Sequence, residues 1–189
     1  MAIKQITTKR VVLIGLAPIM FDRYSGDNKT VLTPEQKLYT QGTTLVFPSL
    51  NIISSLSAQN TESFTKRVLP PKEYKAVAAA MLSCISIDQI DIPFLKNGKP
   101  IEIGKFQGDQ DPKSGIQVVR HVARLPKGIP NPKARPVLPL AWELRFGMTI
   151  YPSEVLNEQL IEKIFTQGGI QLGLGTYRGV YGKFKFSWS

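Results

Sequence analysis

The segment Gly168–Phe186, GGIQLGLGTYRGVYGKFKF, combines residue types that together can hold a phosphate chain. It contains six glycines, three cations and four aromatic residues, and it has no acidic residue. A glycine-rich loop exposes backbone N–H groups to a phosphate, cations neutralise phosphates, and aromatic rings stack on bases. The residues predicted to contact nucleic acid here are Gly173, Gly175, Tyr177, Arg178, Gly179, Tyr181, Lys183 and Lys185.

The same glycines have two other interpretations. A dinucleotide-binding loop follows a strand and opens a helix, whereas the pattern here predicts a helix that stops at Gly168-Gly169 and a strand that begins near Tyr181. A tight structural turn, with Gly168-Gly169 as the helix C-cap, is the interpretation that we favour for those two glycines. It leaves the three cations unexplained, so we expect structure and binding to share the segment.

A second basic stretch lies between Lys113 and Arg145, where the only acidic residue is Glu143. A run of charge by itself is typical of a solvated loop, but the prolines here restrict the chain and lower the cost of ordering it around a ligand. We therefore predict that this stretch contacts nucleic acid as well. The residues predicted for that role are Arg120, Arg124, Lys127, Lys133 and Arg135.

Other reactive residues are few. His121 is the only histidine, and as a general base for RNA cleavage it would need a partner acid that the sequence does not indicate. Asp109 and Asp111 lie two apart, but two carboxylates are a weak basis for a metal site. The single cysteine, Cys84, excludes an internal disulfide and a thiolate zinc site, and we interpret it as a small buried hydrophobic residue. We predict no cofactor and no structural metal.

Composition points to the same class of partner. The 189 residues, 42 % of them hydrophobic, suit one domain spanning 1–189. The formal net charge of +10 favours a polyanionic partner, most commonly nucleic acid. The apolar run at 11–21 is too short to cross a bilayer and lacks a cleavage pattern after it, so we expect a cytoplasmic protein without a membrane partner.

Hydrophobic periodicity and turn residues predict the elements that must position these residues. Five prolines in the fourteen residues 126–139 exclude regular structure there, so that segment is predicted to be a loop. Strands are predicted at 11–21, 116–125, 142–151 and 181–189, helices at 49–60, 72–83 and 153–167, hairpins at 39–46 and 85–103, and a further loop at 106–114.

This element order predicts an α+β fold with the β-α-β-β-α-β layout. The layout is that of a ferredoxin-like (RRM-like) antiparallel sheet with two helices, elaborated by loop and hairpin insertions around 24–48 and 85–135. Within such a layout, GLGTYRGVYGKFKF resembles the C-terminal glycine-rich loop of the RAMP superfamily, the CRISPR-associated RNA-binding proteins. It also resembles closing segments of uncharacterised phage proteins.

The resemblance implies an RNA-binding fold in a subunit of a ribonucleoprotein, with the glycine-rich loop at the nucleic acid. The motif covers under a tenth of the chain, and no guide-processing site has a counterpart here. The leading hypothesis is a non-catalytic protein that binds RNA or single-stranded nucleic acid, with other ribonucleoprotein subunits as further partners. Two alternatives stay open, a metal-independent endoribonuclease that uses His121 and a basic phage structural or inhibitor protein that acts through protein contacts.

Overall fold

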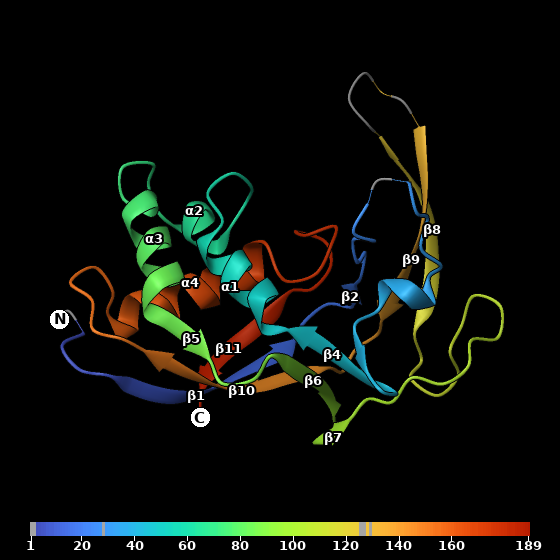
Figure 1. The fold of residues 1–189 in the computed structure, drawn as a ribbon, viewed down its shortest axis with the longest axis horizontal. Helices are drawn as coiled ribbons and strands as arrows, with labels where there is room; N and C mark the ends of the chain where they lie inside the picture. Colours follow the sequence, from blue (N-terminus) through green and yellow to red (C-terminus); the bar gives the residue numbers. More distant parts are fainter. Residues whose placement is uncertain (1–2, 28, 125–127, 129) are drawn as a thin grey trace.

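The computed structural model describes residues 3–27, 29–124, 128 and 130–189, with residues 123 and 124 described in backbone only. This part of the chain is α+β, as the sequence predicts, with helices packed on a mostly antiparallel sheet (Figure 1). The helices are η1 (Glu35–Lys37, a 3-10 turn), α1 (Ser49–Ser57), α2 (Phe64–Val68), α3 (Tyr74–Cys84) and α4 (Glu158–Gln171). The strands are β1 (Thr7–Gly15), β2 (Ile19–Met20), β3 (Thr40–Gln41), β4 (Thr44–Pro48), β5 (Ile85–Ile87), β6 (Asp91–Lys96), β7 (Lys99–Pro100), β8 (Gln117–Arg124), β9 (Pro130–Leu138), β10 (Glu143–Ile150) and β11 (Phe184–Trp188).

An eight-stranded sheet forms the base of the molecule. Its order is β11-β1-β10-β6-β4-β3, with β5 beside β10 and β7 beside β6. The central pair, β1 and β10, is antiparallel and in register from Thr7 opposite Ile150 to Ile14 opposite Glu143. Every second residue of β10, from Leu144 onward, is buried, as the alternation in the sequence predicts. The strand expected at 142–151 is therefore confirmed.

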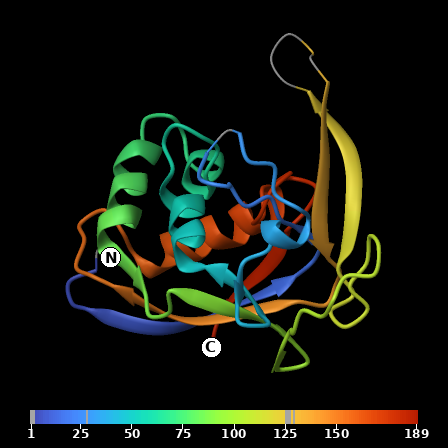
Figure 2. The ribbon, with the colours of Figure 1, turned by 45° about the vertical axis from the view of Figure 1, so that its right-hand side comes forward.

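In the described part of the chain, helices cover one face of this sheet, and no helix lies on the other face (Figures 1 and 2). On the covered face, Phe165 of α4 stacks on Phe186 of β11 with ring centroids 4.8 Å apart. The final strand alternates as predicted, since Phe184 and Phe186 are buried whereas Lys185 is exposed. β11 pairs with β1 so that Phe184 lies opposite Gly15, and the segment that precedes β11 therefore lies close to the residues that follow β1.

The prediction that α4 stops at Gly168-Gly169 is wrong, because the helix continues to Gln171. Both glycines are buried inside the helix. A Cβ at Gly168 would overlap the side chain of Phe64, and a Cβ at Gly169 would lie 2.6 Å from the ring of Phe184. These glycines are present because two aromatic rings pack directly on the helix backbone.

The prediction of an irregular loop at 126–139 is also wrong, because most of it forms β9, the partner of β8 in a hairpin. The carbonyls of Ala134 and Pro136 point away from β8, since they accept from Lys37 Nζ and from the backbone N–H of Phe21. Backbone groups two residues apart in a strand face the same side. The missing N–H groups of the β9 prolines therefore all face away from β8 and interrupt no ladder bond with it; these prolines are Pro130, Pro132 and Pro136.

β9 also pairs with β2, which gives a three-stranded sheet in the order β2-β9-β8. β2 begins at Ile19, directly after Pro18, so the apolar run predicted as one strand at 11–21 is divided and supplies strands to both sheets. The β8–β9 hairpin consequently stands beside the main sheet and is anchored to it through the N-terminal segment (Figure 1).

The remaining predictions are mostly confirmed. The hairpins expected at 39–46 and 85–103 correspond to β3–β4 and β6–β7, the second with Asn97 and Gly98 at positive φ. The helices expected at 49–60 and 72–83 correspond to α1 and α3, whereas α2 was not predicted. Ser49 starts α1 without capping it. α4 begins at Glu158 after Asn157, rather than at Ser153 as predicted.

Among the described residues, no helix is long and apolar enough to cross a membrane.

Candidate nucleic-acid interface

The glycine segment between α4 and β11 folds back on itself. The Leu174 N–H donates to Gly182 O at 2.9 Å, and the Gly182 N–H donates to Pro18 O at 2.7 Å. Gly182 has φ of 71°, and a Cβ there would overlap the Leu174 carbonyl. Gly175 has φ of 79°, and its Cβ would lie 2.5 Å from Met20 O. These glycines permit close contact between backbone segments of the protein itself.

The tip of the segment is different. Gly179, with φ of 88°, has only one atom near an added Cβ, the Gln171 carbonyl oxygen at 3.9 Å. Tyr177 is the other unusual position, a non-glycine residue at φ of 54° whose side chain is 54 % exposed. Its ring meets Tyr181 with centroids 6.2 Å apart and His121 with centroids 5.3 Å apart. The structure thus brings the glycine segment and the β8–β9 hairpin, predicted separately, together at Tyr177.

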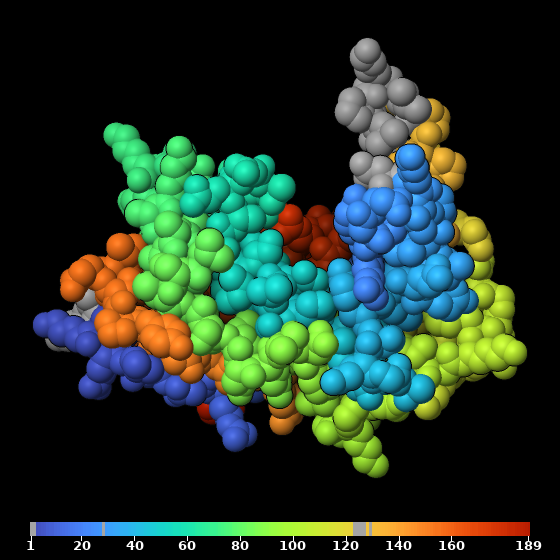
Figure 3. All heavy atoms as spheres, in the orientation of Figure 1, coloured from blue at the N-terminus to red at the C-terminus, as the bar shows by residue number. Residues whose placement is uncertain are grey.

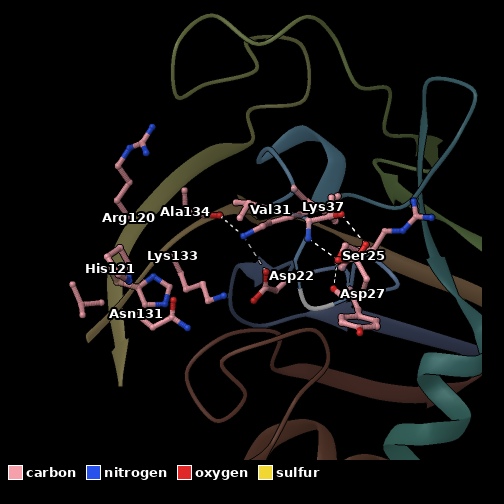
Figure 4. Close-up of a pocket in the computed structure, with 16 residues that line it drawn as sticks. Asp22, Ser25, Asp27, Val31, Lys37, Arg120, His121, Asn131, Lys133 and Ala134 are labelled. Carbon is pink, nitrogen blue, oxygen red and sulfur yellow. Dashed lines mark hydrogen bonds and ion pairs between the residues drawn. The ribbon is translucent and has the colours of Figure 1, made fainter. Parts of the chain in front are cut away.

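A hollow runs along this junction. In Figure 3 the red C-terminal segment forms its floor, between the teal helices on one side and the blue segment that follows β2 on the other. The space between residues 22–37 and the hairpin is a cavity of about 750 Å³, lined by Arg120, His121, Lys133 and other residues (Figure 4). A cavity of this size can take a bound chain or a drug-sized ligand.

The cations of the glycine segment have different surroundings. Arg178 is half-buried, and burial lowers its pKa from the ordinary value while the charge of Glu62 opposes that shift. Lys183 is half-buried at the start of the last strand, where its carbonyl accepts from Leu16 N–H at 2.7 Å. Lys185 points to the sheet face that no helix covers. Within the described chain, no ion pair engages these three side chains.

The hairpin cations also separate into groups. Lys133 lines the cavity and has no ion pair with any described residue. Arg120 is exposed and paired with Asp109, with 2.6 Å between Arg120 Nη2 and Asp109 Oδ1. That pair raises the pKa of Arg120 and lowers that of Asp109. Lys127 lies outside the described residues, and the side chain of Arg124 is not described.

Arg135 is not a surface contact, because its side chain is buried and ion-paired. Its guanidinium lies 2.6 Å from Asp22 Oδ2, and Lys37 Nζ lies 3.1 Å from the other carboxylate oxygen. Burial alone would raise the pKa of Asp22, but hydrogen bonds and charge from Arg135 and Lys37 hold it below its ordinary value. This cluster fixes the hairpin to the segment after β2, and we replace the phosphate role predicted for Arg135 by this structural one.

No pattern in the sequence indicates Asp22 or Lys37 as members of the site. Lys37 belongs to a stretch, 23–48, that mixes turn dipeptides with scattered apolar residues, and Asp22 directly precedes it. Their partner Arg135 comes from a distant part of the chain, and a pairing over such a distance leaves no periodic pattern. Figure 4 shows Lys37 reaching the carbonyl of Ala134 and the carboxylate of Asp22 from one position.

His121 is held by the same cluster. Its Nε2 lies 2.5 Å from Nη1 of Arg135. An arginine can only donate, so Nε2 must accept and the ring proton must reside on Nδ1. Burial lowers the pKa of His121, as does the charge of Arg135. The lone pair that a general base would use is therefore occupied by a hydrogen bond within the protein.

The paired acids have structural partners. The Asp111 carboxylate is buried and accepts from the backbone N–H groups of Gly104, Lys113 and Ser114, which holds the loop before β8 in shape. Among the described residues, no group of three or more His, Cys, Asp or Glu side chains could hold a metal ion. Cys84 is half-buried, not fully buried as expected, and lies 3.5 Å from Ser83 Oγ.

The chain was compared with known protein families and with curated proteins. No family model matches its sequence, and no curated protein matches it.

Proposed function

We propose that this protein binds single-stranded nucleic acid, RNA in particular, along the hollow above the glycine segment and in the adjoining cavity of the β8–β9 hairpin, and that it does not cleave the strand. The observation that carries the proposal is the position of Tyr177, half-exposed and fixed by ring contacts to His121 and Tyr181. Tyr177 also lines a cavity. An exposed aromatic face held in place beside a cavity is what an unstacked base needs as a platform.

Charge supports the same ligand. Lys133 on the hairpin and Arg178 and Lys183 on the glycine segment are free of ion pairs within the described chain. Cations beside stacking platforms are the usual arrangement in proteins that bind single strands, because the two groups serve the phosphates and the bases of one chain. Arg120 can join them by exchanging its surface pair with Asp109 for a phosphate, since an exposed ion pair contributes little.

The arrangement of the main sheet supports a ferredoxin-like fold of the RAMP type. The helices α1 to α3 lie between β1 and β6 in the chain, and α4 lies between β10 and β11. In the sheet, β10 lies between β1 and β6, and β11 flanks β1 on its other side, as a split β-α-β layout requires. We propose on this basis that the protein works as a subunit of a ribonucleoprotein complex.

Cleavage has less support. A general base must be able to accept a proton from the 2′-hydroxyl that attacks the phosphate. The Nε2 lone pair of His121 already accepts from Arg135, and the carboxylate nearest to that pair, Asp22, is bound to two cations. Protection of a bound strand therefore fits the geometry better than its hydrolysis.

The test is the affinity for a labelled oligonucleotide of about 15 residues, measured by fluorescence anisotropy as salt is raised from about 50 to 300 mM. We expect log Kd to rise linearly with log salt. The change Lys133→Ala should reduce that slope by about 0.7, the value for one phosphate contact on a single strand. Lys75→Ala, on the exposed face of α3, is the matched control and should leave the slope unchanged.

A flat salt response of the wild type would overturn the proposal. Equal slopes for wild type and Lys133→Ala would remove the hairpin from the interface. The RNA recovered after incubation with the protein and a chelator should be intact, and its cleavage would favour the enzyme.

A further inference from the structure

A second cavity opens beside the proposed interface. It has a volume of about 340 Å³ and lies between α1 and the glycine segment. Asn51 and Ser54 line it from α1, Thr61 and Glu62 from the segment before α2, and Arg178 from the opposite wall. Tyr177, the proposed stacking platform, lines it too, so the cavity adjoins the path of a bound strand.

The packing of α1 against the core determines which of its polar side chains line the cavity. Ile52 and Leu56 are fully buried and fix the rotation of the helix, which places Asn51 and Ser54 together on the adjacent face. Within the described part of the chain, the amide of Asn51 and the guanidinium of Arg178 make no hydrogen bond to another protein group. A half-buried amide and a half-buried cation therefore face one cavity without a hydrogen-bond partner from the described protein, and both are available to bind a ligand.

The donor and acceptor set fits one class of ligand. An asparagine amide offers an N–H donor and a C=O acceptor side by side, which matches a ring acceptor beside an exocyclic amino donor, the pair that adenine and cytosine carry and uracil lacks. Glu62 pairs with Arg67 through Oε2 at 3.4 Å, and its other oxygen adds an acceptor to the cavity. That acceptor favours a base with an exocyclic amino group and disfavours uracil, whose corresponding atom is a carbonyl oxygen. Arg178 can meet the phosphate of the same nucleotide at the wall of the cavity.

We propose that this cavity accepts one base of the bound strand and selects a base with an amino donor beside a ring acceptor, such as adenine, over uracil, with Asn51 as the residue that determines specificity and Arg178 on the adjoining phosphate. The inference depends on the proposed function, since the base belongs to the strand in the hollow. Cations and stacking alone bind a strand without regard to its sequence, and this cavity would add a preference for one kind of base.

The experiment compares two oligoribonucleotides of about 15 residues, one of uridine only and one with a single central adenosine. The two strands differ in one base only, so the stacking of the free strand changes little while the base offered to the cavity changes. We expect it to tighten wild-type binding about fivefold or more, the effect of one good two-point contact. The same pair built with deoxyribose tests whether the preference persists in DNA.

Three variants separate the contributions. Asn51→Leu keeps the size of the side chain and removes its hydrogen-bonding groups, so the adenosine advantage should vanish while affinity for the all-uridine strand stays within about twofold. Arg178→Ala should weaken both strands alike. Leu50→Ala, at the neighbouring exposed position of α1, is the control and should change neither value. Melting temperatures establish that each variant is folded.

The outcomes distinguish this inference from the function on which it depends. If the wild type binds neither strand, the proposed function fails. If it binds both equally, or if Asn51→Leu keeps the full adenosine advantage in a folded protein, the base-reading cavity is refuted while strand binding stands.

Discussion

The rings of His121 and Tyr177 meet edge to face, with centroids 5.3 Å apart and planes at 72°. His121 lies on β8 and Tyr177 in the glycine segment, so this contact joins the hairpin to the C-terminal turn. An edge-to-face pair is worth about 0.5–1.5 kcal/mol beyond the area it buries. Tyr177 therefore has an orientation set before any ligand arrives, and its outer surface stays exposed.

The first prediction concerns this tyrosine. Tyr177→Ala should weaken oligonucleotide binding by about 1–3 kcal/mol, the range for loss of one base-stacking platform. The salt slope should stay unchanged, because no phosphate contact is lost. Anisotropy titrations at several salt concentrations measure both quantities.

The control for this change is Tyr151→Ala. Tyr151 is 42 % exposed and follows β10, outside the hollow. Its removal should leave affinity intact. Equal losses for the two variants would mean that Tyr177 contributes no specific stacking.

The strands of the main sheet could be predicted because their burial repeats with a simple period. β10 and β11 each alternate between a buried face and an exposed one, and the sequence displays that alternation directly. β9 could not be predicted by the same rule. Its prolines are tolerated because all their missing N–H groups face one side, a property that depends on the pairing partner and not on proline content.

The site was predictable in part. Glycine, aromatic and cationic residues indicated the C-terminal segment as a candidate site, and in the structure Tyr177 and Arg178 line one cavity. The sequence did not reveal which cations are already neutralised inside the protein, because Arg135 meets Asp22 only when β9 pairs with β2, a distant segment of the chain. It also did not reveal that Gly175 contacts the protein backbone at Met20. Spacing alone does not distinguish a glycine that packs from one that binds.

The second prediction concerns pH. The groups that face His121 are Arg135 and Lys133 on β9, Asp22 after β2 and Lys37 on η1. Its pKa in the folded protein lies below the ordinary 6.5, chiefly because burial and then the charge of Arg135 disfavour the imidazolium. The unfolded chain therefore binds the proton more readily as pH falls below 6.5, and folding stability declines until the pH reaches the folded pKa.

Thermal melts from about pH 7.5 to 5.5 check this. The wild type should lose stability on acidification, while His121→Gln, which keeps an acceptor for Arg135 but cannot titrate in this range, should lose less. Asp22 stays ionised throughout, since its pKa lies below its ordinary value of 3.8. Identical pH profiles for the two proteins would contradict the assigned environment of His121.

The third prediction compares two aspartates. Asp22→Asn removes the counter-charge of two largely buried cations, Arg135 and Lys37, and should lower the free energy of unfolding by about 2–3 kcal/mol. Asp109→Asn removes the partner of the exposed Arg120 and should have a small effect. Urea denaturation measures both. A loss for Asp22→Asn no larger than that for Asp109→Asn would mean that the cluster does not hold the hairpin.

The last prediction separates packing from conformation within the glycine segment. Gly182 and Gly179 both have positive φ, so alanine at either position carries a backbone penalty of about 1–2 kcal/mol. At Gly182 the added Cβ would also overlap the Leu174 carbonyl, whereas at Gly179 its nearest neighbour is an atom 3.9 Å away. Gly182→Ala should therefore lower the melting temperature well below that of Gly179→Ala. Equal melting temperatures would show that the backbone contact at Gly182 is not tight. Gly179→Ala, still folded, can then be titrated with the oligonucleotide, and reduced affinity there would place the open tip of the turn against the phosphate chain.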